Sequence, residues 1–454
     1  MSDTKSAGEA LRPYNPGAGS VSPGGWSRRD ATHFLWRTQY GATQAEIDLA
    51  VAQGLEKTLE RRLTPQPESA AFQSAEALLR RTAFDTSSIS DLKTWWLYRM
   101  LNSANPLVEK MSLLWHGHFA TSNAKVHSVP NMAAQNDLIR EHAVGSFRKL
   151  LHGMARDVAM LVWLDGNSNR KRQPNENFAR EVMELFSLDV GHYTENDIKE
   201  AARAFSGWQL RDGKFWFNPL QHDAGSKTVF GKTGNFDGDD IVDLCLAQDA
   251  CPRFLAFKIL REFVVPNPDA GMIDALAQRI RFHDFAMTPV LRELFGSQLF
   301  FSPAARGAVI KGPVELVLGA HRSLESHPNL SAAVPLLAAL GQDIFEPPTV
   351  KGWDGGRLWI SSTSMLQRAN FASELATGSR LGTIADPERS AEALDLETPE
   401  AIVRHYVGLL LNRDLEPEVL ARLTAYLNES QGSSGQRIRG VIQLIMTSPE
   451  FQLV

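Results

Sequence analysis

An acidic residue on an apolar helix face is the feature that most constrains this chain. Residues 174–208 read PNENFAREVMELFSLDVGHYTENDIKEAARAFSGW, a pattern that predicts two helices joined by a short turn. The apolar residues within about 80° of Phe178 on a helical wheel are Val182, Leu185 and Leu188. Glu181 falls among them, at about −60°. An ionised carboxylate there is costly unless it is paired or binds a metal, so Glu181 requires a partner.

Two arrangements would satisfy this requirement. In the first, Arg180 pairs with Glu176 and Glu184 on the solvent side of the helix. Glu181 then takes an arginine from a neighbouring helix. In the second, Glu181 faces a functional site, together with Glu184 three residues later. The sequence leaves both arrangements open.

Composition excludes several classes of protein. The 454 residues are 43% apolar, enough for a large core, and the net charge of −5 gives no basic footprint for nucleic acid. No window approaches the roughly 18–20 apolar residues of a membrane span. Cys245 and Cys251 are the two cysteines and cannot form a disulfide framework. The chain also lacks the glycine-rich dinucleotide and P-loop motifs, His-Glu-x-x-His, Gly-x-Ser-x-Gly and Cys-x-x-Cys.

The start of the chain carries a partial export signal. Residues 27–30, Ser-Arg-Arg-Asp, are followed by Phe34 and resemble a twin-arginine motif. Arg37 and Gln39 interrupt the apolar core that should come next. A cytoplasmic location is therefore the default expectation.

The pattern along the chain predicts a mainly α protein. Residues 1–25 are rich in Gly, Pro and Ser and are expected to be disordered or draped on the surface. Residues 26–385 are expected to form one helical core domain. Turn dipeptides and the loss of helical period predict irregular or hairpin excursions at 209–240 and 341–362. Residues 396–454 are expected to form a small C-terminal helical subdomain.

A His-x-His pair, His116 and His118, lies in the sequence WHGHF. In a helix the two side chains diverge by about 160°, so they would share a ligand only on extended backbone, which Gly117 permits. Imidazole suits Zn, Cu, Fe and Ni. The alternative is that each histidine makes one hydrogen bond in the core.

Two further constellations lie in the excursions. His222-Asp223 could supply a general base, a ligand or a surface turn. Residues 347–356 surround Lys351 and Trp353 with prolines and glycines, and Trp359 follows. Such tryptophans either stack on sugars or bases, or plug the body of the protein.

Several stretches resemble the large bacterial family catalogued as domain of unknown function 1800, over about residues 30–454. They are FLWRTQYGAT near the start, WHGHFATS, residues 175–208, HDAGSKTVFG, KGPVELVLG, GQDIFEPPTVKGWDGGRLWI and the closing SPEF. The resemblance implies an α-rich bacterial protein without an agreed reaction. Many members are exported, which this N-terminus does not show. Asp189 stands where such sequences more often have Gly.

Residue chemistry leads to one expectation and two alternatives. We expect a metal-dependent hydrolase acting on a polar, carbohydrate-like substrate, with a divalent metal activating water. Its expected residues are Glu181, Glu184, His222 and Asp223 for catalysis, His116 and His118 for the metal, and Arg180, Lys351, Trp353 and Trp359 for the substrate. The first alternative is metal-free cleavage of glycosides by the pair Glu181 and Glu184. The second is a non-catalytic protein that binds a polysaccharide or a partner protein.

Overall fold

The structure is a computed structural model that describes residues 11–14, 25–378, 380–384 and 386–454. The segment predicted to be disordered or draped, residues 1–25, lies largely outside these ranges. Within its described part, Tyr14 stacks on Phe301 with the ring centroids 4.3 Å apart.

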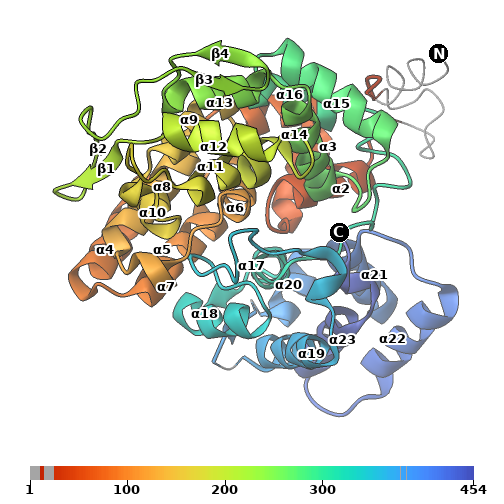
Figure 1. Cartoon of the computed structure of the whole chain (residues 1–454). Helices are drawn as coiled ribbons and strands as arrows, with labels where there is room; N and C mark the ends of the chain where they lie inside the picture. The colour runs from red at the N-terminus through yellow and green to blue at the C-terminus, as the bar shows by residue number, and fades with distance from the viewer. Residues whose placement is uncertain (1–10, 15–24, 379, 385) are drawn as a thin grey trace.

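The prediction of a mainly α fold is confirmed, as Figure 1 shows. The helices of the first half are α2 (Arg28–Thr38), α3 (Gln44–Leu63), α4 (Ala70–Thr86), α5 (Ile89–Asn102), α6 (Pro106–His118), α7 (Asn123–Val126), α8 (Val129–His142), α9 (Phe147–Ala155), α10 (Val158–Trp163), α11 (Glu176–Met183) and α12 (Glu195–Ala204). Those of the second half are α13 (Gly238–Ala247), α14 (Ala250–Phe263), α15 (Ala270–Phe282), α16 (Met287–Phe295), α17 (Pro313–Ser323), α18 (Leu330–Ala339), α19 (Ser362–Thr377), α20 (Pro387–Ala393), α21 (Pro399–Leu411), α22 (Pro417–Glu429) and α23 (Ser434–Thr447). Short turns of other helix types are η1 (Gly166–Ser168), η2 (Glu184–Leu188), η3 (Gly356–Trp359) and η4 (Glu450–Gln452).

The described strands form three two-stranded antiparallel sheets. They are β1 (Trp208–Arg211) with β2 (Lys214–Phe217), β3 (Lys227–Val229) with β4 (Lys232–Gly234), and β5 (His327–Pro328) with β6 (Gly382–Thr383). The first two sheets are the hairpins expected in residues 209–240. Asp212 and Gly213 link β1 to β2, both with positive φ, as a tight hairpin turn requires.

The core is built around large aromatic side chains on α5 and α6. Trp95, Trp96 and Trp115 are fully buried there, and α6 packs on α5 and α8. In the described part of the chain, no helix combines the length and apolar character needed to cross a bilayer. The twin-arginine-like residues begin α2, where Ser27 and Asp30 form a capping box and Arg28 pairs with Asp48.

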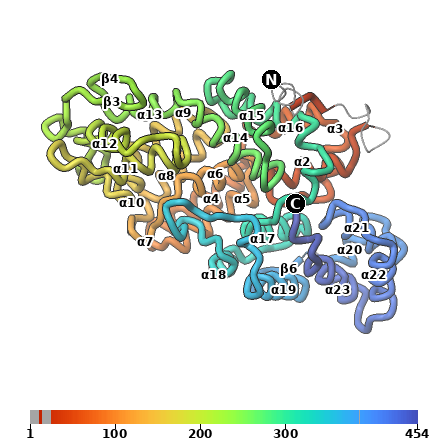
Figure 2. The backbone as a smooth tube through the Cα atoms, turned by 45° about the vertical axis from the view of Figure 1, so that its right-hand side comes forward, coloured from red at the N-terminus to blue at the C-terminus, as the bar shows by residue number. Residues whose placement is uncertain are grey.

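The C-terminal helices lie together at one end of the molecule, opposite hairpin β3–β4 (Figure 2). Helices α21, α22 and α23 pack on one another, and α23 also packs on α19. Two lysines of the first helices bond α17 and the loop that follows α18. Lys93 on α5 bonds Asp343 and Glu346, and Lys110 on α6 bonds Glu315 on α17.

The segment 174–208 contains the two predicted helices, α11 and α12, but the first does not remain α-helical. Its last turn, η2, is a π-helix. A regular α-helix would place Ser187 about 180° from Phe178, on the solvent side. Ser187 is instead fully buried, and Leu185 is half-exposed. The wider π-turn therefore shifts which residues face the core.

Candidate functional site

Glu181 lies in the last turn of α11 and is half-buried. Among the described residues, no group donates a hydrogen bond to its carboxylate. Burial raises the pKa of Glu181 above its ordinary value, and the nearby Glu184 raises it further. Arg180 and Lys351 act in the opposite direction. The neutral form of Glu181 is thus more favoured than that of an ordinary glutamate.

Arg180 does not follow the predicted (i, i+4) pairing. Its guanidinium donates to both carboxylate oxygens of Glu195 on α12, at 2.9 and 2.8 Å. The expectation that Arg180 pairs with Glu176 and Glu184 was wrong, because α12 folds back alongside α11 and offers a bidentate partner. No described arginine bonds Glu181, so the first of the two sequence-based arrangements does not occur.

Glu184 has a different environment from Glu181. Its carboxylate accepts a hydrogen bond from the Tyr193 hydroxyl. Burial, and then this bond to Glu184, raise the pKa of Tyr193 to about 12. Tyr193 therefore remains a hydrogen-bond donor at neutral pH and fixes the position of Glu184.

The π-turn that carries Glu184 also shapes its surroundings. It turns the Phe186 carbonyl toward His118 Nε2, 3.1 Å away. Just after the turn, Asp189 has φ 68° and ψ 168°. This conformation is one that glycine adopts easily and other residues adopt only under strain. Single π-turns and strained backbone both concentrate at functional sites.

Lys258 on α14 is a half-buried lysine near His118 and Asp189 that the sequence analysis missed. It lies over the Phe254 ring at 4.9 Å, and among the described residues none accepts a hydrogen bond from its amine. Burial lowers the pKa of Lys258 to about 8, Arg261 lowers it further and Asp189 opposes this shift. The same helical-wheel argument that selected Glu181 would have found Lys258, since it falls about −60° from Leu255 on the apolar face of α14.

The two candidate metal ligands are both buried but face different surroundings. Residues 116–118 are the helical end of α6, so the side chains diverge. His116 Nε2 accepts the amide of Phe345 at 3.0 Å, while His118 Nε2 lies against the Phe186 carbonyl and its Nδ1 has no partner. Within the described ranges, no three His, Cys, Asp or Glu side chains are grouped so as to hold a metal ion. His116 and His118 therefore have separate hydrogen-bond partners and do not converge on one ligand.

His222 and Asp223 lie beside the end of α12. Asp223 bonds Arg203 at 2.8 Å and the amide of Gly225 at 2.9 Å, and these contacts, with the bond to Arg203 first, lower the pKa of Asp223 to about 2. His222 Nδ1 lies 2.9 Å from the Ser206 carbonyl. None of their contacts within the described residues reaches Glu181 or Glu184. The pair anchors the loop between β2 and β3.

The proline- and glycine-rich loop approaches the end of α6. Gly352 has φ 78°, and a Cβ there would lie 2.2 Å from the Gly117 carbonyl oxygen, so only glycine permits this approach. The Trp353 ring lies 5.7 Å from that of His116. Trp359 lies against the backbone at Gly312 and Gly341. Both indoles therefore pack on the protein itself, while the exposed Lys351 acts electrostatically on Glu181.

Buried His116 should make the fold sensitive to acid. Burial lowers the pKa of His116 to about 3, from 6.5 in the unfolded chain, so its stabilising contribution is lost as pH falls from 6.5 toward 3. Between pH 7 and pH 5 this costs about 2 kcal/mol. Measured by urea unfolding, the free energy of unfolding of His116→Gln should fall by about 2 kcal/mol less than that of the wild type between pH 7 and pH 5. The exposed His192→Gln should behave as the wild type, and equal slopes in all three would contradict the prediction.

The fold and this site define a mainly α-helical protein with a carboxyl pair at a π-turn. The family described as Protein of unknown function (DUF1800) matches residues 33–453. The chain therefore belongs to this family, as its motifs indicated. Among curated proteins and solved structures, none matches the chain.

Proposed function

We propose that this protein is a hydrolase that works by general acid–base catalysis at Glu181, without a protein-bound metal, on a polar substrate such as a saccharide. The observation that carries the proposal is the contrast between two neighbouring carboxyl groups. Glu181 has no hydrogen-bond donor among the described residues and a raised pKa, whereas Glu184 is bonded by Tyr193. Paired carboxyls in different environments are the usual basis for dividing acid and base roles.

In this proposal Glu181 donates a proton to the leaving group, because burial and the charge of Glu184 raise its pKa. Glu184, held by Tyr193, stabilises positive charge or activates the attacking group. Lys351 adds positive charge near Glu181 and suits a substrate with electron-rich oxygens. Arg180 keeps α12 against α11 through Glu195 and has a positioning role.

Two earlier expectations receive less support. The surroundings of His116 and His118 do not fit a metal, so no step is assigned to one. A non-catalytic sugar-binding role would use exposed indole faces, and Trp353 and Trp359 are half-buried with part of each ring against the protein. The metal-free carboxyl pair remains the best supported of the alternatives.

Glu181→Gln should abolish turnover while preserving the fold. Release of reducing ends from a panel of bacterial and plant polysaccharides measures the activity of the purified protein. Loss of the acid–base group should lower kcat by about 100-fold or more. Thermal stability should be unchanged or higher, since the variant removes a poorly solvated carboxylate.

Glu176→Gln is the matched control, because Glu176 is exposed in the first turn of the same helix. It should retain wild-type activity. Failure of the wild type to hydrolyse any substrate in the panel would overturn the proposal. Full activity of Glu181→Gln would overturn it as well.

A further inference from the structure

Hairpin β1–β2 projects from the helical body, and large apolar side chains are exposed on it and on the turn that follows. Figure 1 shows the two strands extending away from the helices at one edge of the molecule. Trp216, Phe217 and Leu220 are all exposed, although they lie within five consecutive positions of the chain. Single exposed apolar residues are normal on a protein surface, whereas a group of them is typical of an interaction site.

The register of the hairpin places Trp216 on its free face together with two cations. Arg211 and Lys214 lie directly opposite each other, and Trp216 follows two residues after Lys214, so the three side chains share a face. The Arg211 guanidinium lies 5.4 Å from the centre of the Trp216 ring. Trp208 belongs to the other face, where Arg156 covers its ring at 5.5 Å. The free face is therefore both aromatic and basic.

The turn after β2 holds Leu220 in water. The amide of Gln221 donates to the Asn218 carbonyl at 3.1 Å, and the amide of Leu220 donates to Asn218 Oδ1 at 3.1 Å. These bonds fix the turn from within and leave Leu220 87% exposed. Burial of this aliphatic side chain against a partner would therefore be favourable without any change of the backbone.

A basic loop lies beside this turn. Residues 170–172 are Arg-Lys-Arg, and all three are exposed. The amide of Lys171 donates to the Gln221 carbonyl at 2.7 Å, which holds the loop against the turn that carries Leu220. Within the described residues, none of the three basic side chains forms an ion pair. Their charges therefore face solvent next to an exposed apolar side chain.

The charge of this surface is opposite in sign to that of the whole chain. We call residues 170–172 and 208–221 the docking patch. It contains five basic residues and one acidic residue, Asp212, whereas the chain as a whole has a net charge of −5. Asp212 lies 3.9 Å from Arg211 and is itself fully exposed. The docking patch is thus complementary to a negatively charged partner.

We propose that the docking patch binds the surface of a membrane that contains anionic lipids. Tryptophan is enriched at the boundary between lipid and water, where Trp216 and Leu220 would enter the headgroup region. Each Lys or Arg near an anionic leaflet strengthens binding by roughly 5-fold, which gives the five cations a role. Nucleic acids and polysaccharides would use the cations and the rings, but a fully exposed leucine suits neither.

Sedimentation with sucrose-loaded vesicles tests the proposal on the full chain. Binding to vesicles with about 30% phosphatidylglycerol should be at least about 10-fold tighter than to phosphatidylcholine alone, at about 0.1 M salt. The double variant Lys171→Gln and Arg172→Gln should weaken this binding by about 10-fold or more. The matched control is Lys57→Gln with Arg61→Gln, two exposed cations on α3, which lies away from the hairpin in Figure 1. It changes the net charge equally and should bind as the wild type.

The double variant Trp216→Ser and Leu220→Ser distinguishes a membrane from a soluble polyanion. It should weaken binding to phosphatidylglycerol vesicles by about 10-fold and leave binding to heparin, a soluble polyanion, unchanged. Circular dichroism checks that the fold is retained. Phe282→Ser, at a residue 71% exposed on α15, is the apolar control and should bind vesicles as the wild type.

Two results would overturn the proposal. The first is failure of the wild type to sediment with phosphatidylglycerol vesicles. The second is equal vesicle binding by the wild type and by Trp216→Ser with Leu220→Ser, because the docking patch would then recognise anionic polymers by charge alone. Glu181→Gln should bind vesicles as the wild type, so the outcome is independent of the hydrolase proposal.

Discussion

Replacing Glu109 with Leu is expected to destabilise the protein by about 3–5 kcal/mol, since it breaks a buried ionic network. Glu109 is 1% exposed on α6. Its Oε1 accepts from Arg99 Nε at 3.1 Å and from Arg140 Nε at 3.0 Å, and its Oε2 accepts from Trp96 Nε1 at 3.0 Å. The variant leaves two poorly hydrated guanidinium groups facing each other without the shared anion. Urea unfolding followed by circular dichroism measures the loss.

Glu141→Leu is the matched control for Glu109→Leu. Glu141 is exposed at the end of α8, and the ion-pair contact of its carboxylate within the described residues is to its neighbour His142, at 4.0 Å. Its replacement should change stability by less than about 0.5 kcal/mol. Glu109→Gln, which keeps the shape and removes the charge, should fall between the two. A loss below about 1 kcal/mol for Glu109→Leu would show that the network does not hold α5, α6 and α8 together.

Arg37→Met is expected to lower the free energy of unfolding by a similar amount, about 3–5 kcal/mol, for a different reason. The last carbonyls of a helix have no partner within it. Arg37 supplies partners for α14: Nε donates to Phe263 O at 2.9 Å and Nη2 to Val264 O at 3.0 Å. Its Nη1 donates to a main-chain oxygen of Val454 at 3.1 Å. Methionine fills part of the space but leaves the Phe263 and Val264 carbonyls without a described donor, whereas the Val454 oxygen keeps the amide of Val309 at 3.1 Å.

The unfolding midpoint in urea again provides the measurement. The exposed Arg61→Met, in the last turn of α3, is the control and should be nearly neutral. Arg37→Lys keeps the positive charge but cannot reproduce the three-directional donor geometry, so it should recover only part of the loss. Equal stability of Arg37→Met and Arg61→Met would contradict this role of Arg37.

Helical period and turn chemistry predicted most of the architecture. The helical period of the apolar residues identified α11 and α12, and the Asp212-Gly213 turn marked the first hairpin. These features depend on neighbours in the sequence, which is why they could be predicted. The π-turn η2 could not, because it arises where Glu184 to Leu188 pack against α13 and α14, helices distant in the sequence.

The candidate sites divide in the same way. The sequence singled out Glu181 from its place on an apolar face, and the structure leaves that carboxyl without a hydrogen-bond donor among the described residues. The sequence did not show that Arg180 would bond Glu195, or that Arg203 would form an ion pair with Asp223. The wheel applied to every helix would have added Lys258.

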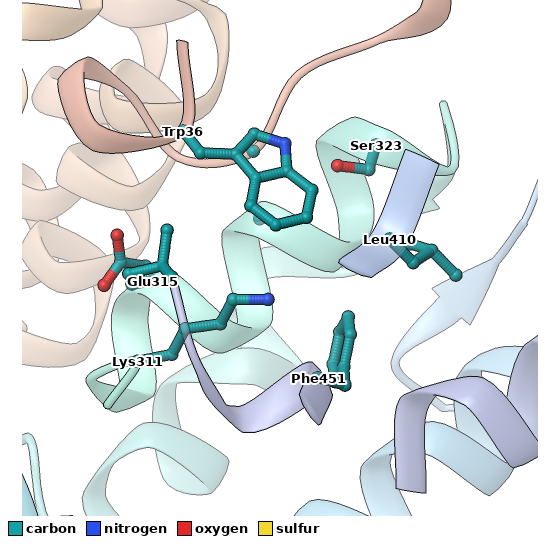
Figure 3. Close-up of a pocket in the computed structure, with 9 residues that line it drawn as sticks. Trp36, Lys311, Glu315, Ser323, Leu410 and Phe451 are labelled. Atoms are coloured by element: carbon teal, nitrogen blue, oxygen red, sulfur yellow. The ribbon is translucent and has the colours of Figure 1, made fainter. Parts of the chain in front are cut away.

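The sequence by itself determined the helical class, the family and the position of Glu181 on an apolar helix face, because each follows from residues close together in the chain. The tertiary structure alone decided which charges are paired and which are not. Pairing depends on side chains brought together from distant segments, as Lys110 and Glu315 are. Lys311 is left as a buried amine beside the Phe451 ring (Figure 3), because that pairing uses the nearby acid.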